Sequence, residues 1–145
     1  QIFTLSCQHE IYNLYEARKK NCFEGLMVNI EGYVCEGTRS NIFIVENNTV
    51  FTPDIESGVR NRGMRKLVMK LARHMDYEVY EGFLSLEKLL KAKECFVAGT
   101  ELEILPVIAI EGKPIGNGVP GKVTCQLIQS FRKFTDHDTL DLDHV

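Results

Sequence analysis

The sequence lacks the features that mark several classes of protein. None of its apolar runs approaches the ~20 residues that a membrane-spanning helix needs. Neither sign of charge dominates, because the formal net charge of the 145 residues is only −3. Such a balance gives little attraction to nucleic acid or to an anionic membrane. We therefore predict neither a nucleic-acid partner nor a membrane partner.

Paired cysteines and clustered histidines are also lacking. The five cysteines are odd in number and well separated, at positions 7, 22, 35, 95 and 125. This pattern predicts reduced thiols in a cytoplasmic protein, and no disulfide framework. The four histidines, at positions 9, 74, 137 and 144, lack the spacing of metal ligands, so we predict no metal site. There is no Gly-x-Ser-x-Gly segment for a serine nucleophile. The first residues lack a basic region and a long apolar core, so we expect no signal peptide.

What the sequence does contain is a polar corner between two strand-like segments. Residues 32–35 lead into Glu36–Gly–Thr–Arg–Ser–Asn41, and the apolar run 42–45 follows. A carboxylate at such a corner is costly to bury unless a cation meets it. From the residues alone, a solvated hairpin turn and a ligand-binding corner are both open interpretations.

The rest of the chain alternates between helix and strand patterns. Apolar spacing and end signals predict helices at 10–21, 63–74, 85–91 and 120–134. Strands are expected at 1–7, 24–30, 50–52, 77–83, 95–98 and 104–110, with a loop at 53–60. Hairpin-length connections between the strands favour a largely antiparallel sheet with helices outside, which is an α+β fold. We divide the chain into a domain at 1–134 and an acidic tail at 135–145.

Several segments carry a resemblance to one family. Glu36–Gly–Thr–Arg–Ser–Asn–Ile–Phe43 resembles the signature of class IV pyridoxal-phosphate enzymes, which include branched-chain aminotransferases, D-amino-acid aminotransferases and aminodeoxychorismate lyases. Further matches follow in family order at 49–53, 63–66, 94–107 and 116–121. The resemblance covers roughly residues 3–134. It implies a carboxy-terminal domain with a partly barrel-like sheet and outer helices. It also implies a homodimer, and an amino acid or an aminodeoxychorismate-like molecule as ligand.

The resemblance assigns roles to particular residues around pyridoxal phosphate. Glu36 would face the pyridine nitrogen and keep it protonated. Backbone groups at the start of a helix would hold the phosphate, together with a second segment opposite. The cofactor-binding residues implied in this way are Glu36, Arg39, Gly63, Met64, Gly99 and Thr100. The family pattern Gly-Ile-Thr-Arg at the helix start is here Arg62–Gly–Met–Arg65, without its threonine.

Two further residues of the family pattern are missing. The lysine that forms the Schiff base aligns with Phe3, and the tyrosine that contacts the phenolic oxygen aligns with Cys7. The first lysine of the chain is Lys19, within a predicted helix. We therefore predict no catalytic lysine and weak, reversible cofactor binding. Glu101 aligns with a small residue beside the substrate carboxylate, so it is expected to disfavour the usual substrate if it faces the site.

Two interpretations follow. The chain is either the carboxy-terminal domain of an aminotransferase-like or lyase-like enzyme, or a non-catalytic relative that binds a ligand or a protein partner. Glu36, Asn41, Gly99 and Thr100 favour the first interpretation, and Phe3 and Cys7 favour the second.

Overall fold

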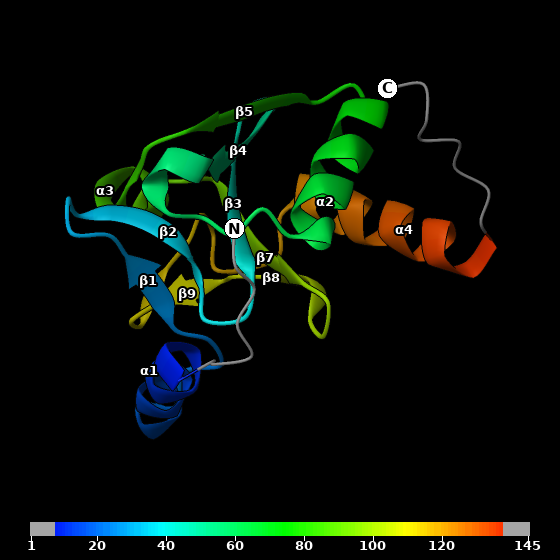
Figure 1. Ribbon diagram of the computed structural model, residues 1–145. Helices are drawn as coiled ribbons and strands as arrows, with labels where there is room; N and C mark the ends of the chain where they lie inside the picture. The colour runs from blue at the N-terminus through cyan, green and yellow to red at the C-terminus, as the bar shows by residue number, and fades with distance from the viewer. Residues whose placement is uncertain (1–7, 138–145) are drawn as a thin grey trace.

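The computed structural model of the chain describes residues 8–137, and three sheets and four α-helices make up most of them (Figure 1). The expected strand at 1–7, with Phe3 and Cys7, lies outside the described residues, as does the tail beyond 137. The prediction of an α+β fold rich in antiparallel strands is confirmed. None of the helices in residues 8–137 is both long and apolar enough to cross a bilayer.

The central sheet has five strands in the order β5-β4-β3-β7-β8. Their bounds are β3 (Asn41–Glu46), β4 (Thr49–Pro53), β5 (Glu78–Gly82), β7 (Glu94–Gly99) and β8 (Glu103–Pro106). All neighbours are antiparallel except β4 and β5, which pair in parallel. A parallel pair needs a long crossover, and here α2 (Gly63–His74) provides it. The largely antiparallel sheet that we predicted thus contains one parallel pair, at its β5 edge.

Two smaller sheets flank the central one. The first contains β1 (Leu26–Val28), β2 (Tyr33–Gly37) and β6 (Leu84–Ser85), and the second pairs β9 (Ala109–Ile110) with β10 (Lys113–Pro114). The prediction of a single strand at 104–110 is therefore wrong. This segment is divided after Pro106, although the Val107 amide still donates to the Cys95 carbonyl of β7 at 2.8 Å.

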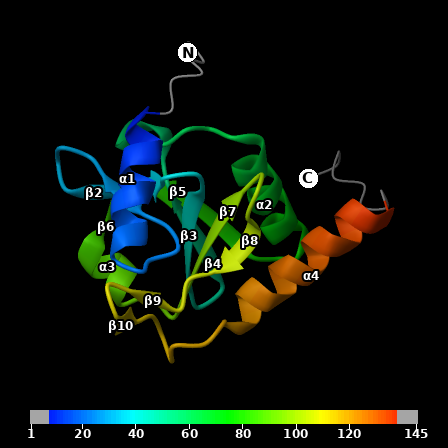
Figure 2. The same ribbon diagram turned by 90° about the horizontal axis from the view of Figure 1, so that it is seen from below.

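The helices lie on different sides of the molecule. α2 and α4 (Lys122–His137) lie side by side, while α1 (Gln8–Lys19) lies next to β1, away from them (Figures 1 and 2). The short α3 (Leu86–Leu90) is capped by Ser85, whose hydroxyl accepts from the Lys88 amide at 3.1 Å, as its sequence predicted. The expected loop at 53–60 contains a 3-10 turn, η1 (Ile55–Ser57).

Each inner strand of the central sheet serves two hydrophobic cores. On β3, Phe43 and Val45 face the core that α2 and α4 cover, whereas Ile42 and Ile44 face the core beneath β2 and α3. This alternation follows from the two-residue period of a strand. Phe43 stacks on Phe96 of β7 with ring centroids 4.9 Å apart. Burial on both faces fixes the position of β3, and Asn41, its first residue, lies at the polar corner.

Candidate functional site

The polar corner between β2 and β3 is held in place by the carboxylate of Glu24. One oxygen of this carboxylate accepts from the amides of Gly25 and Thr38, both at 3.1 Å, and from the Thr38 hydroxyl. Its other oxygen accepts from the Ser40 hydroxyl at 3.3 Å. The corner closes on itself because the Gly37 amide donates to the Ser40 carbonyl at 2.8 Å. The corner is therefore a fixed turn and not a loose surface loop.

Glu36 is buried at the end of β2, with only 2% of its surface exposed. Its carboxylate accepts from the Asn41 side-chain amide at 3.3 Å and from the Arg60 backbone amide at 3.3 Å. The Cys35 thiol next to it donates to the Ser57 carbonyl at 2.8 Å. Burial raises the pKa of the Cys35 thiol, and the charge of Glu36 raises it further. The solvated hairpin turn is thus excluded as a description of Glu36.

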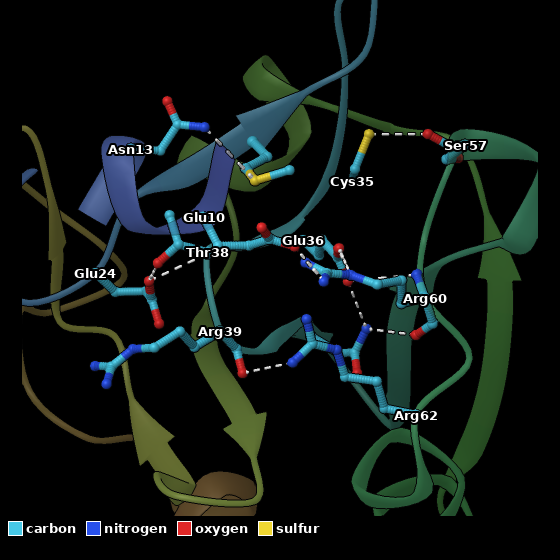
Figure 3. A network of polar contacts seen from close by, with 12 residues as sticks. Glu10, Asn13, Glu24, Cys35, Glu36, Thr38, Arg39, Ser57, Arg60 and Arg62 are labelled. Atoms are coloured by element: carbon cyan, nitrogen blue, oxygen red, sulfur yellow. Dashed lines mark hydrogen bonds and ion pairs between the residues drawn. The ribbon is translucent and has the colours of Figure 1, made fainter. Parts of the chain in front are cut away.

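The cation that meets Glu36 is Arg60, from the segment that precedes α2. Its Nε donates to Glu36 Oε1 at 2.7 Å, and its terminal nitrogen pairs with the carboxylate of Glu10 on α1 (Figure 3). Burial alone lowers the pKa of Arg60, but the contacts with Glu36 and then Glu10 raise it overall. The buried carboxylate therefore has an internal counter-ion, which we did not predict from the sequence.

The start of α2 lies beside the same corner. Arg62 precedes the helix with an extended backbone and gives no side-chain acceptor to the first-turn amides. Its guanidinium instead donates to the Arg39 carbonyl at 3.0 Å. A Cβ built on Gly63 would meet no atom of residues 8–137 within 4 Å, so among these residues the helix start is open on the side where that Cβ would lie. Uncapped first-turn amides and a favourable helix dipole form a natural anion-binding position.

The end of β7 completes the site. A Cβ on Gly99 would lie 2.8 Å from the Arg39 carbonyl, so only glycine allows β7 to approach the corner this closely. Thr100 follows in an exposed turn. The Glu101 carboxylate is exposed and pairs with Arg39 at 3.0 Å. Its charge is therefore paired with Arg39 and screened by solvent.

These contacts bring the predicted residues together to different degrees. Arg39 touches both Gly99 and the residue before Gly63, so the corner, the helix start and the β7 turn form one neighbourhood. Glu36 joins it through Asn41 and Arg60, because the Asn41 amide also donates to the Arg60 carbonyl at 3.1 Å. Met64 is half-buried and packs against the core under α2. A separate hollow of about 500 Å³, next to Phe51 and Tyr80, lies at the far end of β3.

We did not predict Glu10, Glu24 or Arg60 from the sequence. A buried acid predicts a cation somewhere in the chain, but nothing in the sequence indicates which of the 17 lysines and arginines provides it. The hydrogen bonds that Glu24 accepts from the corner have no signal in the sequence either, because they depend on which carboxylate the fold brings next to the corner.

The residues present fit the phosphate and the ring nitrogen of pyridoxal phosphate, but they show no covalent anchor. The open start of α2 suits a phosphate, and Glu36 suits a group that bears an N–H. The Asn41 side-chain oxygen is buried and accepts no hydrogen bond from residues 8–137, so the site has acceptor capacity to spare. Within the same residues, no lysine forms a hydrogen bond or ion pair with Glu36. The lysine position itself, Phe3, lies outside the described residues.

Comparison with known proteins gives a consistent result. The family model described as amino-transferase class IV matches residues 2–110. A branched-chain-amino-acid aminotransferase of Escherichia coli (strain K12) is 38% identical over 116 residues, which make up 80% of this chain and 38% of that protein. The chain thus spans well under half the length of this curated relative.

Solved structures agree with the sequence comparison. The branched-chain amino acid aminotransferase from Escherichia coli matches with a TM-score of 0.89 and 34% identity, covering 93% of this chain and 46% of that chain. The branched-chain amino acid aminotransferase from Thermobaculum terrenum, in its PLP form, matches with a TM-score of 0.83 and 34% identity. That match covers 88% of this chain and 42% of the other.

Proposed function

Since the chain belongs to the class IV aminotransferase family, we propose that it is a carboxy-terminal cofactor-binding domain of an aminotransferase-like or aminodeoxychorismate lyase-like protein. Pyridoxal phosphate is the cofactor, held reversibly. The observation that carries this proposal is the buried carboxylate of Glu36 beside the open start of α2. A buried acid and an uncapped helix start, joined through Asn41, Arg60 and Arg62, match the two polar ends of a phosphorylated pyridine.

Each group has a defined task in this proposal. The first-turn amides at Gly63 and Met64 bind the phosphate, with Thr100 and the backbone of Gly99 on the other side. Arg39 adds a positive charge, tempered by its pair with Glu101. Glu36 accepts from the ring nitrogen. When bound, the cofactor supplies an electron sink for a carbanion on an amino-acid substrate. The family's covalent step requires a lysine amine, which Phe3 cannot supply.

The test is an absorbance titration of the chain with pyridoxal 5′-phosphate, followed by borohydride reduction and peptide mapping. We expect saturable, reversible binding without stoichiometric labelling of any one lysine. Glu36→Gln should weaken binding by about tenfold or more, because a buried acceptor of the ring proton loses its charge. Glu31→Gln, at an exposed turn of the same strand pair, is the matched control and should bind as the wild type does. Binding that does not saturate, or that ignores Glu36→Gln, would refute the proposed function.

The alternative is a non-catalytic relative that binds a partner, and one surface favours an interaction of this kind. Ile11, Tyr12 and Tyr15 on α1 are each more than half exposed. Apolar side chains gathered on one helix are typical of association surfaces. We therefore propose a homodimer or a larger assembly that covers this face of α1. Light scattering at micromolar protein should give at least twice the monomer mass, and Tyr12→Glu should lower it, whereas a monomeric wild type would contradict the proposal.

A further inference from the structure

Three ionisable side chains from distant parts of the chain meet at the end of β2. Glu10 comes from α1, Glu36 from β2 and Arg60 from the segment before α2 (Figure 3). Their side chains are 18%, 3% and 34% exposed. We refer to these three residues as the acid–arginine triad. Two carboxylates and one guanidinium leave the triad with one unbalanced negative charge.

The contacts of the triad are unequal in strength. The Arg60 Nε lies 2.7 Å from Glu36 Oε1, which is a short charge-assisted contact. The donors at Glu36 Oε2, the Asn41 amide and the Arg60 backbone, are both at 3.3 Å, which is long for a hydrogen bond. The strongest partner of the buried acid is therefore a side chain of the chain itself. An N–H group of a ligand that binds Glu36 therefore has to share the carboxylate with Arg60.

Arg60 has a second acceptor, and this makes a change of partner possible. Its terminal nitrogen pairs with Glu10, whose carboxylate is more exposed than that of Glu36. A guanidinium that leaves Glu36 can thus stay paired and charged on Glu10, at the solvent side. The side-chain oxygen of Asn41 marks a position where the site could accept a further hydrogen bond. Its amide nitrogen is fixed by two acceptors, Glu36 and the Arg60 carbonyl, so its oxygen, without a donor in residues 8–137, faces elsewhere in the same buried site.

We propose that Arg60 is a built-in counter-ion that competes with the ring nitrogen of a phosphorylated pyridine for Glu36, and that Glu10 holds Arg60 when the ring is bound. This inference rests on the proposed function. Two cations at one buried carboxylate repel each other, so Arg60 lowers both the affinity for the ring and the pKa of its nitrogen. Glu10 has the opposite effect, because it draws Arg60 away and adds a negative charge. Arg60 and Glu10 are positioning residues, and neither needs to touch the ligand.

The probe is pyridoxamine 5′-phosphate, which has no aldehyde and so cannot react with surface lysines. Binding to the full 145-residue chain is measured by calorimetry, and the protonation of the bound ring by absorbance as a function of pH. Arg60→Leu should tighten binding by about tenfold and let the ring keep its proton to higher pH. Glu10→Gln should weaken binding by about fivefold. Glu16→Gln, an exposed acid on the same helix paired with Lys19, is the matched control and should change neither quantity.

The opposite signs of the two effects separate this proposal from a purely structural role. A structural role predicts that both substitutions weaken binding and that neither shifts the ring pKa. If Arg60→Leu does not fold, Glu10→Gln and the charge-preserving Arg60→Lys still test the proposal, because Arg60→Lys should leave the ring pKa near that of the wild type. Equal affinities for Glu10→Gln and Glu16→Gln would overturn it. Failure of every variant to bind the probe would refute the proposed function itself.

Discussion

Removal of the Glu24 carboxylate should loosen the polar corner and destabilise the whole chain. The carboxylate accepts from two amides and two hydroxyls, and Thr38 and Ser40, which carry the hydroxyls, are fully buried. A buried donor left without an acceptor costs roughly 1–3 kcal/mol. The Thr38 amide keeps the Gly25 carbonyl as an acceptor at 3.0 Å, so the two hydroxyls dominate the loss.

For Glu24→Ala we therefore expect a loss of about 3 kcal/mol in the free energy of unfolding, less than the sum of the separate costs because one carboxylate serves both hydroxyls. Glu24→Gln should cost about 1 kcal/mol, since its oxygen can replace Oε1 and its amide can donate to the Ser40 hydroxyl. The measurement is urea unfolding followed by far-ultraviolet circular dichroism. Glu31→Ala removes an exposed acid nearby and should change the stability very little. Equal losses for the alanine and glutamine variants would refute this reasoning, because charge and not acceptor geometry would then dominate.

Three further predictions concern other parts of the molecule. Gly99→Ala should destabilise the chain by about 2 kcal/mol in the same assay, because its Cβ would lie 2.8 Å from the Arg39 carbonyl; an unchanged stability would show that the backbone yields freely. The pKa of Glu10 is lowered from its ordinary value of 4.5, chiefly by hydrogen bonding with its own backbone; burial acts in the opposite direction, and Arg60 lowers the pKa further. Its ionised form therefore stabilises the fold above that value, and the stability difference between wild type and Glu10→Gln should shrink as the pH falls past 4.5; a constant difference would contradict this. Burial raises the pKa of Cys95 to about 12, so iodoacetamide at neutral pH should label the partly exposed Cys22 and Cys125 long before Cys95, as peptide mapping can establish.

The elements with strong local signals were predictable from the sequence. α2 has the bounds that its apolar spacing predicted, and Ser85 caps α3 as expected. These signals are local, because a helix face and a cap depend on residues only a few positions apart. The division of the strand expected at 104–110 was missed, because no polar residue in that run marks a break.

Features that depend on distant residues were not predictable in the same way. The parallel pairing of β5 with β4 brings together a segment that precedes α2 in the sequence and one that follows it. The hairpin-length connections elsewhere in the chain gave no indication of this pairing. The residues of the site show the same difference between local and distant signals. The corner residues Glu36 and Asn41 were recognised from one continuous motif, whereas Arg60 and Glu10 reach that corner from 24 and 26 positions away. A single sequence does not indicate which charges meet at such separations.

The two-sided burial of β3 also determines where the chain can change in length. Phe43 and Ile42 belong to different cores, so a shift of one residue along β3 would exchange the two cores and turn Asn41 away from Glu36. An extra residue at the exposed Asn47–Asn48 turn can bulge outward and leave that register unchanged. An extra residue between Glu36 and Asn41 has no such outlet, because Glu24 fixes the corner on one side and Gly99 closes it on the other. Insertions and deletions among relatives should therefore collect at the far end of this hairpin and spare the corner.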